Sequence, residues 1–593
     1  MRIAIAQMDT RAGDFARTSE RMLAAARNAA REGAELIVFG IPVLTGPNPG
    51  ALSESEGFFI DLTETLARLA TEMPIPAVVP AVMNMGRECV YEAVLIRDGI
   101  ASPLRLIAWQ RSESEWGAYP EELGFRLGGV DFGIVFDFHG FERYTHGRAK
   151  ADCILCLPLY CFNTNDEMTM LAPSVADGCF VGEASASDSW IVAVGAVGGY
   201  DEQVFAGGSF VMAPWGELAW AAPSFEETFA VVDVDTMSEG PLAEPIAPML
   251  RNRITSLWDA LVIATRDLFE KEGLFEASII LTGDAASSAC ATLLVDALGP
   301  TKVHAFIAPA GDADVSDCIH QLARNLRLEA IEPLAGEGMA EQLDALRALP
   351  SSPDALDLLS AIRVRMSAAQ GWVCVSPQDK TALALEPART ALPGCVFAPF
   401  GDVYRTDLLA LARHRNTVSP VIPVPLLSRF RVPSLDGMDA SRTSDENLVN
   451  EMDAVLLLHI ERSLGITAIS QQLSTPLVAS VIDELGRQGI ARETMPFFPV
   501  MSDRTLHERD WPLGSAWKDR PREGAVYGAD GIDRVAERLF SQLAGGPSAD
   551  AEFDSEAHIT DMLGLLSEIS TGVDVPTDPR GIDPFDMGFF SAN

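Results

Sequence analysis

Basic residues are scarce in this sequence, because 44 lysines and arginines stand against 84 aspartates and glutamates, for a formal net charge of −40. Such a surface repels the phosphates of nucleic acids and the head groups of anionic lipids. Long apolar runs are also missing, since none reaches about 18 residues without a charge or a helix breaker. We therefore expect neither nucleic acid nor a membrane among the partners of this chain.

The first residues, MRIAIAQMD, lack the charged and then apolar pattern of a secretory leader, so we expect a cytoplasmic protein with reduced thiols. Nine cysteines are present. The pair Cys153-x-x-Cys156 has no second such pair and no histidine close by in the sequence. We interpret both cysteines as core residues rather than zinc ligands, and we predict no metal site.

Apolar residues are plentiful, and the 593 residues, of which 48% are hydrophobic, exceed what one domain of about 300 residues buries. Short β-branched runs alternate with amphipathic patterns, which predict strands at 2–8 and 277–281 and helices at 14–32 and 251–272. A proline-rich connector lies at 236–250. These patterns are typical of two α/β domains in series.

We predict three segments, a first domain at 1–240, a second at 250–518 and a C-terminal extension at 519–593. The end of the extension is strongly acidic, because from position 546 onward ten acids accompany a single base, Arg580. A segment of that composition buries too little apolar surface to fold alone, so we expect it to be partly flexible.

Several stretches resemble one family, the glutamine-dependent NAD(+) synthetases. They lie at 1–46 (MRIAIAQMDTRAGDF…GAELIVFGIPVLTG), 197–218 (VGGYDEQVFAGGSFVMAPWGEL), 282–309 (TGDAASSACATLLVDALGPTKVHAFIAP), 401–416 and 444–448. The resemblance covers roughly 1–518. It implies an N-terminal αββα nitrilase-like sandwich that carries a glutaminase, followed by a Rossmann-like ATP-pyrophosphatase domain and the acidic tail.

The glutaminase of that family uses a glutamate, a lysine and a cysteine, and this chain departs from all three. The family positions correspond to Ile41, Arg111 and Asp137, or to Phe136 in place of Asp137 if the register slips by one. Isoleucine transfers no proton, and neither Asp137 nor Phe136 supplies a thiolate. The cysteines at 153, 156 and 161 follow on the next predicted strand, so we do not expect them to replace the nucleophile.

The ATP loop of the second domain departs from the family pattern SGGxDS as well. The corresponding residues are Thr282, Gly283, Asp284, Ala286 and Ser287. Ala286 stands where the family has its metal-binding aspartate, and Asp284 brings a negative charge to the phosphate position. Farther on, Lys380 is retained but Ala382 replaces a second metal-binding acid. We predict no metal ligand at 286 or 382.

Our first hypothesis is a catalytically inactive family member with a structural, filament-forming or regulatory role and no cofactor. The alternative is a divergent enzyme that makes NAD from deamido-NAD, glutamine and ATP with Mg²⁺, and a third hypothesis is a sensor of a nucleotide or of glutamine. The resemblance implies dimer surfaces in both domains, so we expect a homo-oligomer. Phe585, Phe589 and Phe590 in the tail are candidates for docking to a protein partner.

Overall fold

The computed structural model describes residues 1–40, 42–84, 89–112, 123–165, 170–249, 251–309, 312–332, 355–435, 445–508 and 517–521. Ile41 and the acidic tail from 546 lie outside the described residues. The chain divides into two compact units. Unit 1 contains Met1–Phe275 and Pro499–Met501, and unit 2 begins at Glu276 and resumes at Ser502.

Unit 1 is built on two six-stranded sheets. The first has the order β14-β1-β2-β3-β4-β5, with β14 (Thr228–Asp233), β1 (Arg2–Gln7), β2 (Leu36–Phe39), β3 (Ala77–Asn84), β4 (Cys89–Arg97) and β5 (Ile100–Pro103). The second has the order β13-β12-β9-β8-β7-β6, with β13 (Leu218–Ala221), β12 (Phe210–Met212), β9 (Trp190–Ala193), β8 (Cys153–Cys156), β7 (Val130–Val135) and β6 (Gly124–Leu127). A separate hairpin pairs β10 (Val197–Tyr200) with β11 (Gln203–Ala206).

The two sheets pack face to face because residues on both faces of their strands are apolar. On β1, Ile3 and Ile5 belong to the core between the sheets, while Ala4 and Ala6 face the core beneath the outer helices. This alternation follows from the two-residue period of a strand. Both cores are therefore built from the same strands.

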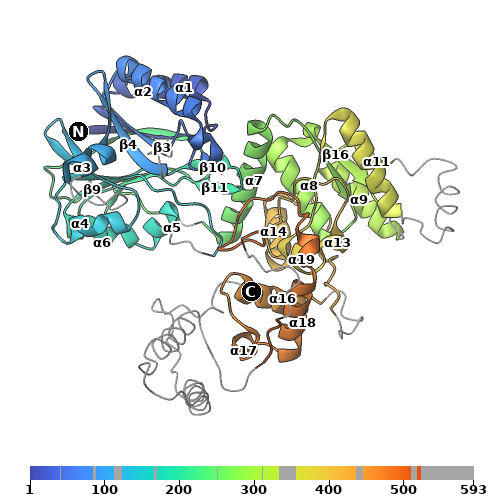
Figure 1. Ribbon diagram of the computed structural model, residues 1–593. Helices are drawn as coiled ribbons and strands as arrows, with labels where there is room; N and C mark the ends of the chain where they lie inside the picture. The colour runs from blue at the N-terminus through green and yellow to red at the C-terminus, as the bar shows by residue number, and fades with distance from the viewer. Residues whose placement is uncertain are drawn as a thin grey trace, which may run out of the picture. The chain divides into compact units, whose positions relative to one another are not determined.

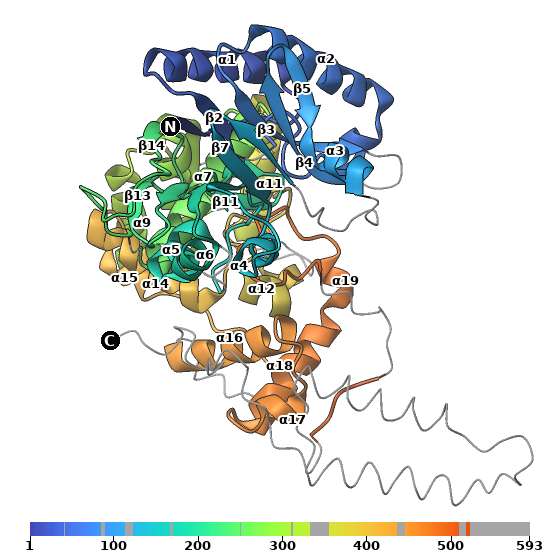
Figure 2. The same ribbon diagram turned by 90° about the vertical axis from the view of Figure 1, so that its left-hand side faces the viewer.

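Helices cover the outer faces of the two sheets, as both views show (Figures 1 and 2). On one side lie α1 (Phe15–Arg31) and α2 (Glu56–Glu72), and on the other α4 (Glu142–Thr145), α5 (Leu171–Ala176) and α6 (Cys179–Ser187). α3 (Leu104–Ser112) follows β5. Asp14 caps α1, because its side chain accepts a hydrogen bond from the Arg17 amide. Unit 1 is an αββα sandwich.

The helix α7 (Arg253–Lys271) follows the proline-rich connector. Its contacts assign it to unit 1. The predicted domain division assigns this helix and 499–501 to the second domain, whereas the contacts group both with unit 1. Lys271, in its last turn, donates to Asp9 Oδ1 (2.6 Å) and to the Gly199 carbonyl (2.7 Å). These contacts fix α7 to the end of β1 and to the β10–β11 hairpin.

Unit 2 contains a parallel four-stranded sheet of order β17-β16-β15-β18. Its strands are β15 (Ala277–Leu281), β16 (Val303–Ile307), β17 (Ala330–Ile331) and β18 (Val373–Cys374). The helices that connect and extend it are α8 (Ala285–Leu298), α9 (Ala313–Asn325), α11 (Ala355–Gln370), α12 (Lys380–Leu385), α13 (Pro387–Thr390), α14 (Arg405–Val418), α15 (Val424–Leu427), α16 (Glu446–Ile460), α17 (Ile466–Ile469), α18 (Thr475–Arg487) and α19 (Gly489–Arg492). α16 and α18 bury a core of their own with α12.

The predicted mixed α/β fold is confirmed in both units, an αββα sandwich and a unit with a parallel sheet. In the part of the chain that the structure describes, no helix combines the length and the apolar character that crossing a membrane requires.

Candidate functional site

Asp137 is the second residue after β7 in unit 1, and its side chain stabilises the turn that follows. Its Oδ1 accepts a hydrogen bond at 2.8 Å from the amide of Gly140, which lies in the 3₁₀ turn His139–Phe141. The neighbouring Phe136 is buried. The carboxylate therefore has a structural role. This role accounts for an aspartate at position 137 without a catalytic function.

The cysteines on and after β8 are poor candidates for a replacement nucleophile. Burial, with the Asp137 charge adding to it at Cys156, raises the pKa of both Cys153 and Cys156 far above the ordinary thiol value. Burial alone raises the pKa of Cys161 to about 11. A thiol attacks as its thiolate. At neutral pH these three side chains are therefore neutral thiols.

The structure describes only two of the three positions predicted for the glutaminase site. Arg111 lies in the last turn of α3 with an exposed side chain, and Asp137 lies in the turn after β7. Ile41 lies outside the described residues. The grouping of these three positions therefore stays a prediction.

A small cavity in unit 1 is linked through Tyr160 to the residue that follows Asp137. The hydroxyl of Tyr160 accepts a hydrogen bond from the amide of Phe138 (3.0 Å), and Tyr160 also lines the cavity. The other lining residues are Pro158, Met170, Leu171, Gly195, Ala196, Ala206 and Gly207. Among these residues no carboxylate, thiol or amine is present, so the cavity offers shape but no acid, base or nucleophile apart from one phenol.

The ATP-loop positions of unit 2 form the turn between β15 and α8. Gly283 has φ +79°, a conformation that glycine adopts without strain, and a Cβ there would meet Val315 at 2.7 Å. Asp284 caps α8, because its Oδ1 accepts from the Ser287 amide at 2.8 Å. The Thr282 hydroxyl donates to Ser287 Oγ at 3.0 Å.

Two of the amides at the start of α8 are occupied by acceptors from the chain itself. Ser287 donates its amide to Asp284, and Ala285 donates its amide to the Arg429 carbonyl at 2.8 Å. The start of a helix otherwise attracts phosphate through its free amides and its dipole. Here a carboxylate already stands at that position, and a bound phosphate would meet its charge.

Lys380 begins α12 and is fully buried. Its Nζ lies 2.8 Å from Glu461 Oε1 and 3.0 Å from Asp402 Oδ1, and it donates to Ser502 Oγ at 2.7 Å. Burial lowers the pKa of Lys380, but the two carboxylates outweigh it and raise the pKa overall. The ammonium group of the retained lysine is therefore paired with acceptors of the fold itself.

A second buried pair lies next to this lysine. Arg405 Nε donates to Asp379 Oδ2 at 2.8 Å, and Asp379 also caps α12 through the amide of Ala382. Asp453 accepts from Thr381 Oγ1 at 2.6 Å. Our sequence analysis missed this network. Its one signal is the presence of charged residues beside apolar runs, such as the glutamate after LLLHI at 456–460.

The residues present do not fit the metal site of the resemblance. Ala286 and Ala382 carry no ligand atoms in their side chains, and among the described residues no group of three acids, histidines or cysteines is arranged to hold a metal ion. Within the turn before α8, hydrogen bonds join Thr282 to Ser287 and Ser287 to Asp284. We derive no step through Mg²⁺ at these positions.

Comparison with known proteins gives one consistent result. No protein-family model matches the chain. The glutamine-dependent NAD(+) synthetase of Xylella fastidiosa (strain 9a5c) is 26% identical over 559 residues, which cover 87% of this chain and 99% of that protein. The one of Acinetobacter baylyi is 28% identical over 346 residues, which cover 55% of this chain and 63% of that protein, less than two thirds of its length.

Two solved structures share the fold over most of the chain. The glutamine-dependent NAD(+) synthetase from Cytophaga hutchinsonii has a TM-score of 0.65 at 13% identity and covers 87% of this chain and 98% of that one. The synthetase from Acinetobacter baumannii, solved in complex with ADP, has a TM-score of 0.58 at 22% identity and covers 88% and 99%. The fold is therefore shared over most of the chain.

Proposed function

Because the chain belongs to the family of glutamine-dependent NAD(+) synthetases, we propose a divergent enzyme of that activity as the first candidate function. The observation that carries it is the length of the similarity, which spans 99% of the Xylella relative and both α/β units of this chain. Such an enzyme would amidate deamido-NAD with nitrogen from glutamine at the expense of ATP. The comparisons support this candidate more than any other.

This candidate requires catalytic groups other than those at the family positions. In unit 1 Asp137 caps a turn, and in unit 2 Asp284 occupies the start of α8. ATP and its metal would have to bind elsewhere in unit 2.

The second candidate is a family member without catalysis that serves in assembly or regulation. The specific observation in its favour is that the motif residues are used internally, since Asp284 caps α8 and Lys380 pairs with Asp402 and Glu461. A homo-oligomer formed through both units belongs to this candidate. Light scattering of the full chain would show whether it forms an oligomer. The same measurement on a chain truncated before 546 would show whether the tail contributes to that oligomer.

One assay separates the two candidates. The purified chain is incubated with deamido-NAD, ATP and Mg²⁺, with either glutamine or ammonium as nitrogen source, and NAD is measured. NAD from both sources supports the first candidate, and NAD from ammonium alone shows that only unit 2 reacts.

Absence of NAD from both sources, together with an unchanged melting temperature in each ligand alone, supports the second candidate. A ligand-dependent rise of the melting temperature without NAD would instead support a sensor of that ligand.

A further inference from the structure

The last turns of α7 are bonded to the β10–β11 hairpin of unit 1 through a single residue of β10, Gly199. Lys271 Nζ donates to the Gly199 carbonyl at 2.7 Å, and Asp267 Oδ2, one turn earlier in α7, accepts from the Gly199 amide at 2.7 Å. Both backbone groups of Gly199 are therefore bonded to side chains of α7. Neither candidate function assigns a role to this contact.

A second carboxylate, that of Asp9 after β1, lies beside Asp267 at the same ammonium group. Lys271 Nζ is 2.6 Å from Asp9 Oδ1 and 3.8 Å from Asp267 Oδ2. A Cβ on Gly198 would lie 2.2 Å from Asp9 Oδ1 and 3.1 Å from Asp267 Oδ2, so the carboxylates approach each other where only glycine leaves room. Asp267 is 2% exposed, and the Asp9 and Lys271 side chains are 22% and 17% exposed. Two negative charges thus share one largely buried positive charge.

The partners of the two carboxylates are unequal. Asp267 has a second cation, because Arg266 Nε lies 3.3 Å from its Oδ1, and it also accepts the Gly199 amide. Among the described residues, Lys271 is the only cation that pairs with the Asp9 side chain. Because a buried carboxylate with fewer donors loses more on ionisation, Asp9 is the member of the pair that takes up a proton.

The other groups that face Asp9 do not change this assignment. The Tyr200 ring on β10 lies 3.7 Å from Lys271 Nζ, and burial followed by the Asp9 charge raises the pKa of Tyr200 far above its ordinary value, so the phenol stays neutral. Glu227, before β14, accepts the Asp9 amide at 2.7 Å. Arg21 of α1 pairs with Glu227 and donates to the Asp9 carbonyl, so these two charges offset each other.

Burial makes the contact between α7 and the hairpin depend on a proton at Asp9. Burial raises the pKa of Asp9 from 3.8 to about 6, while Lys271 opposes this shift and the Asp267 charge adds to it. When the end of α7 leaves the hairpin, water reaches Asp9 and its pKa returns toward the ordinary value. The proton therefore stabilises the closed contact. This stabilisation is complete below pH 3.8 and is lost as the pH rises through about 6.

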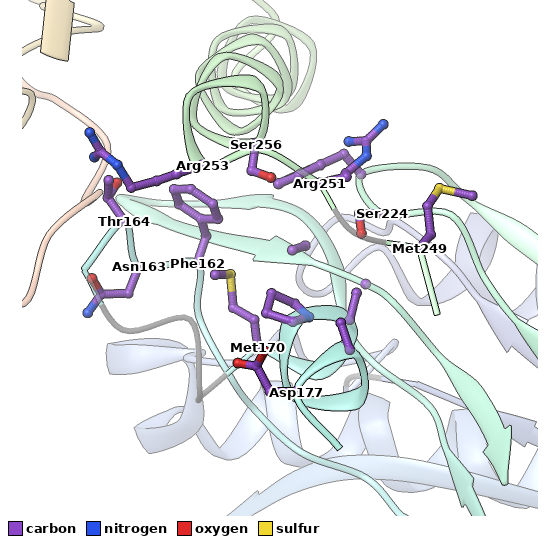
Figure 3. A pocket seen from close by; sticks show the side chains of 16 residues that line it. Phe162, Asn163, Thr164, Met170, Asp177, Ser224, Met249, Arg251, Arg253 and Ser256 are labelled. Carbon is purple, nitrogen blue, oxygen red and sulfur yellow. The ribbon is translucent and has the colours of Figure 1, made fainter. Parts of the chain in front are cut away.

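The hairpin also fixes the walls of two cavities in unit 1. Ala206, the last residue of β11, lines the small cavity and a larger one beside it. Phe162 lines the larger cavity (Figure 3), and its amide donates to the Val204 carbonyl of β11 at 2.6 Å. Ser256, at the start of α7, lines the same cavity (Figure 3). A movement of α7 against the hairpin therefore changes the shape of the larger cavity.

From these contacts we propose that Asp9, Asp267 and Lys271 form a latch controlled by a proton from the solvent. The latch holds α7 against the β10–β11 hairpin more tightly when Asp9 carries that proton. In acid it fixes the walls of the larger cavity, and at neutral pH it releases them more often. The latch requires neither ATP nor turnover, so it is independent of both candidate functions.

Hydrogen exchange of the full chain, measured by mass spectrometry, tests the latch. The rates of segments 197–206 and 265–271 are compared with those of an unstructured chain at the same pH, so that the opening equilibrium alone remains. With a pKa of 3.8 in the open state and about 6 in the closed state, opening should increase about tenfold between pH 5 and pH 7.5. Asp9→Asn keeps the shape of the side chain but does not titrate, so this increase should disappear.

Lys271→Met is a second variant, which decides the matter if Asp9→Asn fails to fold. It removes the ammonium group that lowers the pKa of Asp9, so the pH at which protection falls should move above about 6. Asp259→Asn is the matched control, because Asp259 also lies in α7 but pairs with Arg251 at 2.6 Å rather than with the latch. The control is expected to keep the tenfold change.

Three results would overturn the proposal. The first is protection of the hairpin that stays constant or rises between pH 5 and pH 7.5 in the unmutated chain, because an ionised Asp9 would then hold the contact through Lys271. The second is the same pH dependence in the unmutated chain and in Asp9→Asn, or an unmoved midpoint in Lys271→Met, which would assign the titration to another group. The third is loss of the pH dependence in Asp259→Asn, which would show a general effect of removing charge.

Discussion

The two units differ in what surrounds the positions where the family resemblance places chemistry. In unit 1 the small cavity is lined by apolar residues and one phenol, and none of its lining residues carries a carboxylate, thiol or amine. In unit 2 charges are abundant but satisfy one another, with Lys380 between two carboxylates and Arg405 on Asp379. The cavity of unit 1 therefore has space but no charged group in its lining, whereas the charged groups of the unit 2 network are already paired with one another.

Because of this difference, we expect substitutions at the two sites to affect different properties. An apolar cavity accepts new groups with little cost to the fold, because few polar partners depend on its lining. A buried ionic network does not, since removing one member leaves the others uncompensated. We therefore expect substitutions in unit 2 to change stability most, and those in unit 1 to change ligand preference most.

The largest effect is expected for Lys380→Met. The substitution leaves Asp402 and Glu461 buried without their counter-charge, and breaking a buried pair in this way costs about 3–5 kcal/mol. The free energy of unfolding of unit 2 in urea would measure this loss. Lys518→Met is the control, because the pair of Lys518 with Asp483 is exposed, at 66% and 47% of the side chains, and such pairs contribute about 0–1 kcal/mol. Equal effects of the two substitutions would contradict the difference between the units.

The second effect concerns ATP and the turn before α8. A phosphate about 4 Å from the Asp284 carboxylate meets a repulsion of about 4 kcal/mol at an effective dielectric of 20, or up to about 1,000-fold in affinity. We expect weak binding of Mg²⁺–ATP to the unmutated chain and tighter binding to Asp284→Gly with Ala286→Asp, measured by calorimetry.

Asp284→Asn supplies the control for that comparison, because an asparagine keeps the cap of α8 while it removes the charge. It is expected to recover part of the affinity without a metal ligand. Micromolar ATP binding by the unmutated chain would refute the electrostatic account of this turn.

Much of the fold could be predicted from the sequence, because its signals are local. The apolar run at 2–8 predicted β1, the amphipathic pattern at 14–32 predicted α1, and the run at 277–281 predicted β15. The network around Lys380 could not be predicted, since its partners Glu461 and Ser502 lie 81 and 122 residues away along the chain. Pairing of that kind is decided by packing rather than by any local pattern.

The candidate site was predicted unevenly for the same reason. The sequence alone showed which residue types replace those of the resemblance, as at Asp284 and Ala286. It did not show that Asp284 would cap its own helix, or that Lys380 would lie between Asp402 and Glu461. Those features depend on backbone geometry and on contacts between distant segments.

A third, smaller effect is a pH dependence in unit 2. Burial raises the pKa of Asp453 from 3.8 to about 7, against the hydrogen bonds from Thr381 and Thr406 that lower it. Because the folded state binds the proton more tightly, the contribution to stability is complete below pH 3.8 and is lost as the pH rises through about 7. Unfolding midpoints between pH 5 and 8 should therefore fall with pH, and the slope should be smaller in Asp453→Asn. An unchanged slope would mean that this carboxyl is already ionised in the fold.

The smallest effect is expected at Asp137 in unit 1. Its carboxylate caps a turn at 2.8 Å from the Gly140 amide, so Asp137→Ala should lose about 1 kcal/mol of stability, the usual value of a cap, while Asp137→Asn should lose little because the amide oxygen still accepts. Release of ammonia from glutamine should be the same in the unmutated chain and in both variants, because capping is a structural task. Loss of ammonia release in both variants at unchanged stability would show instead that Asp137 takes part in the reaction, and the contrast between an unreactive unit 1 and an internally satisfied unit 2 would no longer hold.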